Sequence, residues 1–161
     1  MVEQYRTYYE SEIGIIEIVG TIKDLTAVNF VDKESKIISD SHPCLKEYVQ
    51  QIDEYFKGIR KTFTINLEPE GSEFEKKVWN ELIKIPYGET TSYLNIAEKI
   101  GSKKAVRAVG KANGSNKIAI IIPCHRVIGS NGNLTGYGGG IWRKKWLLDH
   151  EAPLNQKELF S

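Results

Sequence analysis

The sequence contains very little cysteine and no long apolar run. Among its 161 residues there are two cysteines, Cys44 and Cys124, and the first residues lack the basic and then apolar pattern of a signal peptide. We therefore expect free thiols in a reducing compartment, although the sequence alone does not exclude a bridge between the two. No segment approaches the roughly 20 apolar residues of a membrane span. These absences predict a cytoplasmic protein without a membrane partner.

Several signatures of common chemistry are missing as well. The sequence has no glycine-rich phosphate cradle, no dinucleotide-binding fingerprint and no pair of catalytic carboxylates. Its N-terminal part offers only His42 and Cys44 as zinc ligands, and a structural zinc site needs four. We therefore predict that no metal is bound.

Charge is unevenly distributed, although the formal net charge is only +1. Residues 1–70 hold eight Lys or Arg and thirteen Asp or Glu, whereas residues 71–161 hold fourteen and eight. The segment 99–126 contains seven basic residues and no acidic one. Such a patch is either a solvated surface or a surface that attracts the phosphates of nucleic acid.

The N-terminal half alternates like a sheet and then like a helix. Short β-rich segments are predicted at residues 5–9, 13–19 and 25–31, and another at residues 62–67. Residues 44–57 have helical spacing, and Gly58 follows as a stop signal. The sequence Glu68-Pro69-Glu70-Gly71 is the best linker candidate. We therefore predict a scaffold domain over residues 1–68 and a second domain over residues 69–161.

The second half is mostly helical. Ser72 and Glu75 form a capping-box pattern before an apolar stripe. A further helix, for which Thr90, Thr91 or Ser92 can be the cap, is expected to run to about Ile100, with Gly101 just past its end. A basic helix with small side chains then runs from Lys103 to about Ala112. This order is typical of a helix-turn-helix, although many helical hairpins bind nothing.

A cysteine and a histidine adjoin an isoleucine-rich run. Residues 118–122 are apolar and mostly β-branched, which predicts a buried strand that ends at Pro123. Cys124 would then stand where a rigid strand opens into a loop, which suits a nucleophile. By itself, a Cys-His dipeptide is more often structural than catalytic.

The surrounding motifs resemble those of the O6-alkylguanine-DNA alkyltransferases. The resemblance covers residues 74–151, about half of the chain, and its ordered blocks are Pro123–Val127, Ile85–Glu89, Ser92-Tyr93, Arg107–Gly110, Asn116, Tyr137–Gly140 and Trp146–Glu151. The resemblance implies an α/β (α+β) fold with a small N-terminal ribonuclease-H-like domain. A mostly helical domain would follow, with a helix-turn-helix and an active-site strand and loop.

That family's chemistry implies catalytic roles for particular residues. Cys124 would accept the alkyl group, and His125 would act through a bridging water while Glu151 orients it. Tyr93 would help rotate the nucleotide and would donate a hydrogen bond to the leaving guanine. Asn116 would brace the active-site turn by side-chain hydrogen bonds. Without the resemblance, Glu151 would be a solvated helix-end residue and Tyr93 a core aromatic. No cofactor is implied, because the protein itself is the acceptor.

The resemblance also implies contacts with DNA and with the flipped base. Arg107 would fill the gap that the base leaves, although a phosphate contact is the simpler alternative. The residues expected to contact DNA are Arg107, Tyr93, Ser92, Lys103, Lys104, Ala105, Lys111, Asn113 and Arg126. The residues expected to line the alkylguanine pocket are Val127, Tyr137, Gly138 and Gly139. Gly138 stands where many members have serine, so a hydroxyl contact would be absent.

The predicted function is repair of O6-alkylguanine, and of O4-alkylthymine as an open possibility, in double-stranded DNA. The alkyl group would pass irreversibly to Cys124 in a single turnover. One alternative is a lesion-binding module without transfer, although such proteins lack the cysteine. Another is an unrelated Cys-His hydrolase, which leaves the basic helix unexplained. We expect a bacterial or archaeal monomer.

Overall fold

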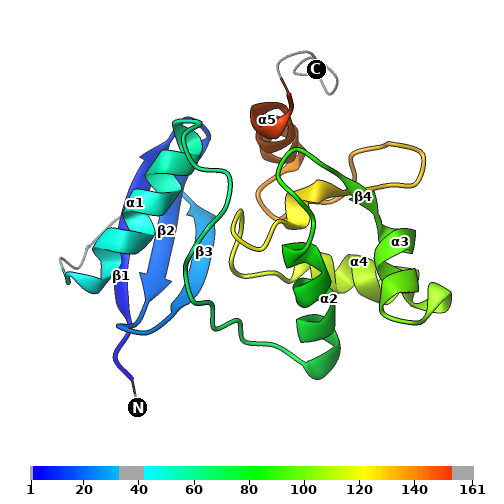
Figure 1. Cartoon of the computed structure of the whole chain (residues 1–161), viewed down its shortest axis with the longest axis horizontal. Coiled ribbons are helices and arrows are strands. Elements are labelled where there is room, and N and C mark those ends of the chain that lie inside the picture. Colours follow the sequence, from blue (N-terminus) through cyan, green and yellow to red (C-terminus); the bar gives the residue numbers. More distant parts are fainter. Residues whose placement is uncertain (1, 33–41, 154–161) are drawn as a thin grey trace. The chain divides into compact units, whose positions relative to one another are not determined.

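The computed structural model describes residues 2–32 and 42–153. The chain divides into two compact units, of which one contains Met1–Glu70 with Lys117–Ala119, and the other Gly71–Asn116 with Ile120–Ser161 (Figure 1). The sequence did not predict that the chain returns to the first unit at residues 117–119. No helix in the described ranges is both long and apolar enough to cross a bilayer.

The first unit is an antiparallel sheet with one covering helix. Its strands are β1 (Tyr5–Ser11), β2 (Gly14–Gly20) and β3 (Leu25–Val31), paired in the order β1-β2-β3. Helix α1 (Cys44–Phe56) packs on β1 and β2. Its apolar face buries Ile52, and the Tyr9 hydroxyl donates to Asp53 over 2.7 Å. Gly58, with φ of +77°, follows the helix as expected.

The strand predicted over residues 62–67 does not form. Only Leu67 makes a bridge, with Leu25. The buried side chain of Gln51 explains the difference, because its Oε1 accepts from the Thr64 amide and its Nε2 donates to the Thr64 hydroxyl. A helix side chain thus satisfies a backbone amide that a sheet ladder would otherwise pair.

The strand predicted over residues 118–122 is also wrong. The Val28 amide donates to the Lys117 carbonyl, and the Ala119 amide donates to the Val28 carbonyl, so only Ile118 bridges to β3. The chain then turns, and Ile120 adopts φ of +74°, a strained conformation for a β-branched residue. The isoleucines are buried as the composition predicted, but burial within a turn satisfies them as well as burial within a strand.

The second unit is built mainly from helices. Its elements are α2 (Glu73–Ile83), β4 (Thr91–Ser92), α3 (Tyr93–Lys99), the 3₁₀ turn η2 (Lys103–Ala105), α4 (Val106–Gly114), the 3₁₀ turn η3 (Cys124–Arg126), β5 (Val127–Ile128) and α5 (Ile141–Glu151). The capping box at Ser72 and Glu75 is confirmed. Strands β4 and β5 pair in parallel, which places the Cys124 turn beside the start of α3.

Helices α3 and α4 form the expected helix-turn-helix pattern. Ser92 caps α3 by accepting from the Asn95 amide, and Gly101 follows the helix with φ of +93°. The basic helix begins as the 3₁₀ turn η2 and becomes an α-helix only at Val106. Val109 and Ala112 are buried, and the Trp79 indole of α2 donates to the Ala112 carbonyl over 2.9 Å. The opposite, basic face of α4 is left exposed.

Candidate active site

Cys124 stands on a tight double turn. Pro123 has φ of −80° and ψ of +63°, and the Cys124 amide donates to the Ile122 carbonyl over 2.8 Å. This is the geometry of an inverse γ-turn. The Arg126 amide then donates to the Pro123 carbonyl as η3 begins. Two successive turns hold the cysteine backbone where the sequence predicted the end of a strand.

The thiol is buried and lies close to a side-chain amide. Asn116 Nδ2 lies 3.3 Å from Cys124 Sγ and also donates to the Ile122 carbonyl over 2.8 Å. Burial raises the pKa of the Cys124 thiol, while the Asn116 hydrogen bond and the charge of Lys144 act in the opposite direction. Because the net shift is upward, most of the thiol is protonated at neutral pH, and a base is needed to generate the thiolate.

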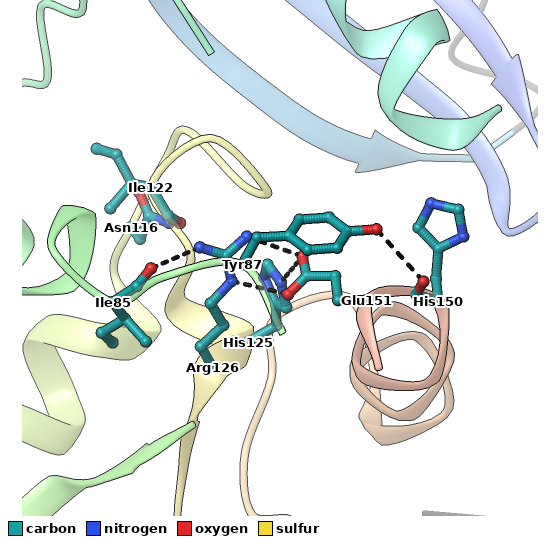
Figure 2. A network of polar contacts seen from close by, with 8 residues as sticks. All are labelled: Ile85, Tyr87, Asn116, Ile122, His125, Arg126, His150 and Glu151. Carbon is teal, nitrogen blue, oxygen red and sulfur yellow. Dashed lines mark hydrogen bonds and ion pairs between the residues drawn. The ribbon is translucent and has the colours of Figure 1, made fainter. Parts of the chain in front are cut away.

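A buried charge cluster lies directly after Cys124. His125 Nε2 is 2.7 Å from Glu151 Oε2 (Figure 2). Arg126 grips the same carboxylate with two nitrogens, Nε at 2.8 Å from Oε1 and Nη2 at 3.0 Å from Oε2. Its Nη1 donates to the Ile85 carbonyl over 2.7 Å. Burial alone would raise the pKa of Glu151, but His125 and Arg126 outweigh burial and lower it, so the carboxylate is ionised.

The Glu151 carboxylate determines which nitrogen of His125 carries the proton. An ionised carboxylate can only accept, so Nε2 must be the donor in the neutral ring. The other nitrogen, Nδ1, is then an unprotonated acceptor. It is buried and has no hydrogen-bond partner among residues 2–32 and 42–153. The ring is therefore arranged as a base, with its proton-accepting atom unengaged.

Arg126 corrects one expectation. The sequence placed it among the basic residues that contact DNA, but the residue is only 6% exposed. Its guanidinium already binds Glu151 and the Ile85 carbonyl, and it lies 5.7 Å from the centre of the Tyr87 ring. Reaching a phosphate would break this arrangement, so Arg126 belongs to the buried cluster.

Asn113 and Ser92 also differ from the expected surface contacts. Asn113 is 3% exposed, and its Nδ2 donates to the Cys124 carbonyl over 3.3 Å. The Ser92 hydroxyl is engaged as the cap of α3. By contrast, the side chains of Lys103, Lys104, Arg107 and Lys111 are exposed on η2 and α4, and Ala105 is half-buried between them. In the described chain these four cations have no acidic partner within ion-pair distance.

A cavity of about 440 Å³ opens between α3, α4 and the loop before α5. This size is within the range of small-molecule sites, roughly 300–1,000 Å³. Its lining residues are Tyr93, Val106, Gly110, Asn113, Gly114, Thr135, Gly136 and Tyr137. Of the four predicted pocket residues, Tyr137 is in this set. Val127 is instead buried in β5, Gly138 is exposed, and the Gly139 carbonyl accepts from Arg143.

Lys144 is a site residue that the sequence did not indicate. It is fully buried on α5, and its Nζ donates to the Thr135 carbonyl over 2.7 Å and lies 5.8 Å from the Tyr93 ring centre. Burial lowers the pKa of Lys144 from 10.5 to about 8, although the nearby Cys124 opposes the shift. In the sequence it stands between Arg143 and Lys145, which is typical of a solvated helix face. No pattern distinguishes it there.

Nothing within residues 2–32 and 42–153 gathers three His, Cys, Asp or Glu side chains as a metal site would. Separately, Cys124, His125 and Glu151 provide a protonated thiol, a histidine whose acceptor nitrogen has no partner in the described chain, and a carboxylate that holds the histidine. The arrangement follows the logic of a nucleophile, its base and an orienting acid.

Two family models match the chain. One is described as 6-O-methylguanine DNA methyltransferase, DNA binding domain, and covers residues 73–153. The other is described as the ribonuclease-like domain of 6-O-methylguanine DNA methyltransferase, and covers residues 4–69.

Curated relatives carry the same kind of name. A methylated-DNA–protein-cysteine methyltransferase from Methanosarcina acetivorans is 49% identical over 153 residues, which is 92% of this chain and 98% of the relative. Another from Mycobacterium tuberculosis (strain H37Rv) is 56% identical over 151 residues, or 91% of each chain.

Solved structures agree in fold. The crystal structure of the M. tuberculosis O6-methylguanine methyltransferase matches with a TM-score of 0.82 and 40% identity, and covers 99% of this chain and 100% of that chain. The M. tuberculosis OGT in complex with DNA matches with a TM-score of 0.82 and 44% identity, over 94% of this chain and 97% of the other.

Proposed function

The chain belongs to the 6-O-methylguanine DNA methyltransferase family, and from this premise we propose how its own residues carry out the reaction. The protein repairs double-stranded DNA by direct reversal. It removes the alkyl group from O6-alkylguanine and keeps it on its own cysteine, so each molecule acts once. Cys124 is the acceptor.

The transfer is a single displacement. Cys124 Sγ attacks the alkyl carbon, the new S–C bond forms, and the bond between that carbon and guanine O6 breaks. The electron pair of that bond leaves with the guanine, which takes up one proton. The thiol proton passes to His125 Nδ1 through a water molecule, and the Glu151 carboxylate stabilises the resulting imidazolium.

One observation carries this assignment. His125 presents Nε2 to Glu151 over 2.7 Å, while Nδ1 is buried without a partner in the described chain, on the same turn as Cys124. A histidine with a purely structural role would have both nitrogens satisfied. Arg126 acts as a positioning residue, because its two contacts hold the carboxylate in place for His125.

The cavity is the place for the extruded base. The target atom lies inside a duplex, so the nucleotide must rotate out of the stack before it can react. Tyr93 and Tyr137 line the cavity. The Tyr93 hydroxyl, which donates to the Thr135 carbonyl over 3.5 Å, is the group that we assign as the hydrogen-bond donor to the leaving guanine. Asn116 braces the turn through the Ile122 carbonyl and lies within 3.3 Å of the sulfur.

The exposed basic face of η2 and α4 is the DNA-binding surface. Arg107 is the residue that fills the space left by the base, because a planar guanidinium can stack and hydrogen-bond at once. Lys103, Lys104 and Lys111 contact phosphates, and Ala105 allows the close approach of the backbone. Ser92 contributes by capping α3 rather than through a free hydroxyl.

The N-terminal residues 1–68 serve as a scaffold for the domain over residues 69–161. No cofactor takes part, since the lesion carries its transferable group and Cys124 receives it. The relatives come from bacteria and archaea, which supports a place in the cytoplasm of such a cell, where we expect the protein to act as a monomer.

A mass measurement tests the function. The protein is mixed with a duplex that contains one O6-methylguanine, and its intact mass and its peptides are determined. We expect a gain of one methyl group on Cys124. The Cys124→Ser variant should bind the duplex without gaining mass, whereas the matched control Cys44→Ser should react normally. A methyl group on Cys44, or no gain in the wild type, would refute the mechanism.

A lesion-binding module without transfer is the alternative, and the same experiment separates the two. Such a module would bind the alkylated duplex and keep its own mass. The presence of Cys124 on the turn, with Asn116 beside its sulfur, favours transfer.

A further inference from the structure

Thr135, in the loop before α5, contacts the polar ends of both Tyr93 and Lys144. Its hydroxyl donates to the Tyr93 hydroxyl over 3.3 Å, and the Tyr93 hydroxyl donates to the Thr135 carbonyl over 3.5 Å. The same carbonyl accepts from Lys144 Nζ over 2.7 Å. Thr135 and Tyr93 both line the cavity, and Thr135 is exposed. One residue therefore engages the phenol oxygen both as a donor and as an acceptor.

The hydrogen bond from Tyr93 to the Thr135 carbonyl is easily given up. It uses the only proton that a phenol can donate. Hydrogen bonds between oxygens usually span roughly 2.5–3.0 Å, so this bond of 3.5 Å is weak. The shorter bond from Lys144 still satisfies the carbonyl when the phenol proton turns away. Tyr93 can therefore direct its proton to a ligand in the cavity without leaving the Thr135 carbonyl unpaired.

The hydroxyl of Thr135 acts on the oxygen of Tyr93 and not on its proton. A hydrogen bond donated to a phenol oxygen draws electron density from it, and hydrogen bonds in a chain strengthen one another. The O–H group of Tyr93 thereby becomes a better donor. In the proposed reaction, negative charge develops on the guanine as the bond between O6 and the alkyl carbon breaks. A stronger donor, already oriented, stabilises more of that charge.

We propose that Thr135 is a positioning residue for the alkyl transfer, whose hydroxyl orients the phenol of Tyr93 and strengthens the hydrogen bond from Tyr93 to the leaving guanine. This proposal rests on the proposed function and on the role that it gives to Tyr93. Lys144 supports the arrangement, because it holds the Thr135 carbonyl in place from within the fold. In the sequence, Thr135 stands in the glycine-containing stretch 129–136, which is typical of a solvated loop.

Single-turnover transfer from an O6-methylguanine duplex, measured over a range of protein concentrations, tests the proposal. Thr135→Val removes the hydroxyl and keeps the carbonyl and the volume of the side chain. We expect the maximal rate to fall about threefold to tenfold, the scale of one neutral hydrogen bond, at an unchanged half-saturating concentration. Thr135→Ser, which keeps a hydroxyl, should recover most of the rate. Thr90→Val, at an exposed threonine outside the cavity lining, is the matched control and should keep the wild-type rate.

A double substitution separates action through Tyr93 from a general effect on the loop. In a Tyr93→Phe background the phenol oxygen is absent, so Thr135→Val should slow transfer no further. An equal second loss in that background would overturn the proposal, and so would a wild-type maximal rate for either Thr135→Val or Tyr93→Phe. A change in the half-saturating concentration alone would overturn it too, because Thr135 would then be a DNA contact. A wild type that gains no methyl group would instead refute the proposed function.

Discussion

Two arginines of the second unit, Arg107 and Arg126, have opposite environments. Arg126 is 6% exposed and binds the Glu151 carboxylate and the Ile85 carbonyl. Arg107 lies on α4 with its side chain in solvent, and the described residues provide it with no acidic partner. Both count equally in the basic segment of residues 99–126. Arg126 stabilises the buried Glu151 carboxylate from within the fold, and Arg107 is exposed to solvent.

The comparison shows why a charge count overestimates a binding surface. A guanidinium removed from water needs a carboxylate or carbonyl to replace its hydration, and Arg126 has both. Once Arg126 is excluded, the exposed cations of this segment are Lys99, Lys103, Lys104, Arg107, Lys111 and Lys117. Replacing Arg126 should therefore impair a different property of the protein from replacing Arg107.

Replacing Arg126 should have the largest effect. Arg126→Ala leaves the ionised Glu151 buried with only His125, and breaking a buried pair by removing one partner destabilises by about 3–5 kcal/mol. Urea unfolding followed by circular dichroism measures this loss. Because a displaced carboxylate no longer orients His125, transfer to free O6-benzylguanine should be lost as well.

The Arg126→Lys variant separates the effect of the positive charge from that of the two hydrogen bonds to Glu151. Lysine keeps the charge but cannot form the bidentate hydrogen bonds to the carboxylate, so Arg126→Lys should recover only part of the stability that Arg126→Ala loses. If Arg126→Ala unfolded with the wild-type midpoint and lost only its affinity for DNA, the buried role would be wrong and the surface role correct.

Replacing Arg107 should leave stability unchanged and impair duplex repair. A surface substitution away from packing changes the free energy of unfolding by less than about 0.5 kcal/mol. Stacking next to bases contributes about 1–3 kcal/mol, so Arg107→Ala should slow reaction with an O6-methylguanine duplex roughly five- to a hundredfold. Reaction with free O6-benzylguanine, which needs no extrusion, should hardly change.

Two further outcomes bear on Arg107. Arg107→Lys should restore part of the duplex rate, because lysine supplies charge without a stacking plane. Equal slowing of the duplex and the free base would contradict the extrusion role and indicate a general defect.

Local sequence signals predicted some parts of the second unit correctly and others incorrectly. The capping box at Ser72 and the glycine at 101 predicted helix ends correctly, because each acts through its immediate neighbours. The run at residues 118–122 was misread, since an apolar composition is the same for a buried strand and a buried turn. The grip of Arg126 on Glu151 joins residues 25 apart in the sequence. No local pattern encodes such a pairing.

Lys144 provides an intermediate case, a buried cation without a carboxylate in the described chain. Burial lowers its pKa from 10.5 to about 8, so the unfolded chain binds more protons than the folded one between these values. This contribution makes the wild type more stable as pH rises from 8 to 10.5. Lys144→Met removes the buried charge and should raise the free energy of unfolding by about 1–2 kcal/mol at pH 7.

That gain should shrink at higher pH, because wild-type Lys144 is then already neutral. Unfolding of both proteins at pH 7 and at pH 9.5 gives the two differences. The exposed control Lys111→Met should stay within about 0.5 kcal/mol of the wild type. A gain of equal size at both pH values would mean that packing, and not the buried charge, explains the effect.

The smallest expected effect is that of a single exposed lysine on the salt dependence of DNA binding. If about four of the six exposed cations contact phosphates, the logarithm of the binding constant should fall with the logarithm of salt concentration at a slope near −4, because each contact releases a counterion. Lys103→Ala or Lys111→Ala should make this slope shallower by about one unit. Lys84, an exposed residue at the end of α2 that pairs with Glu81 over 3.1 Å, provides the matched control, and Lys84→Ala should leave the slope unchanged.

Titrations on undamaged duplexes of differing sequence provide the measurement, and binding should be nearly indifferent to sequence, since phosphates carry no sequence information. A binding constant that does not change with salt would mean that the face containing Arg107 is only a solvated surface. Arg107 and Arg126 would then differ in burial alone, and Arg107 would have no ligand-binding role.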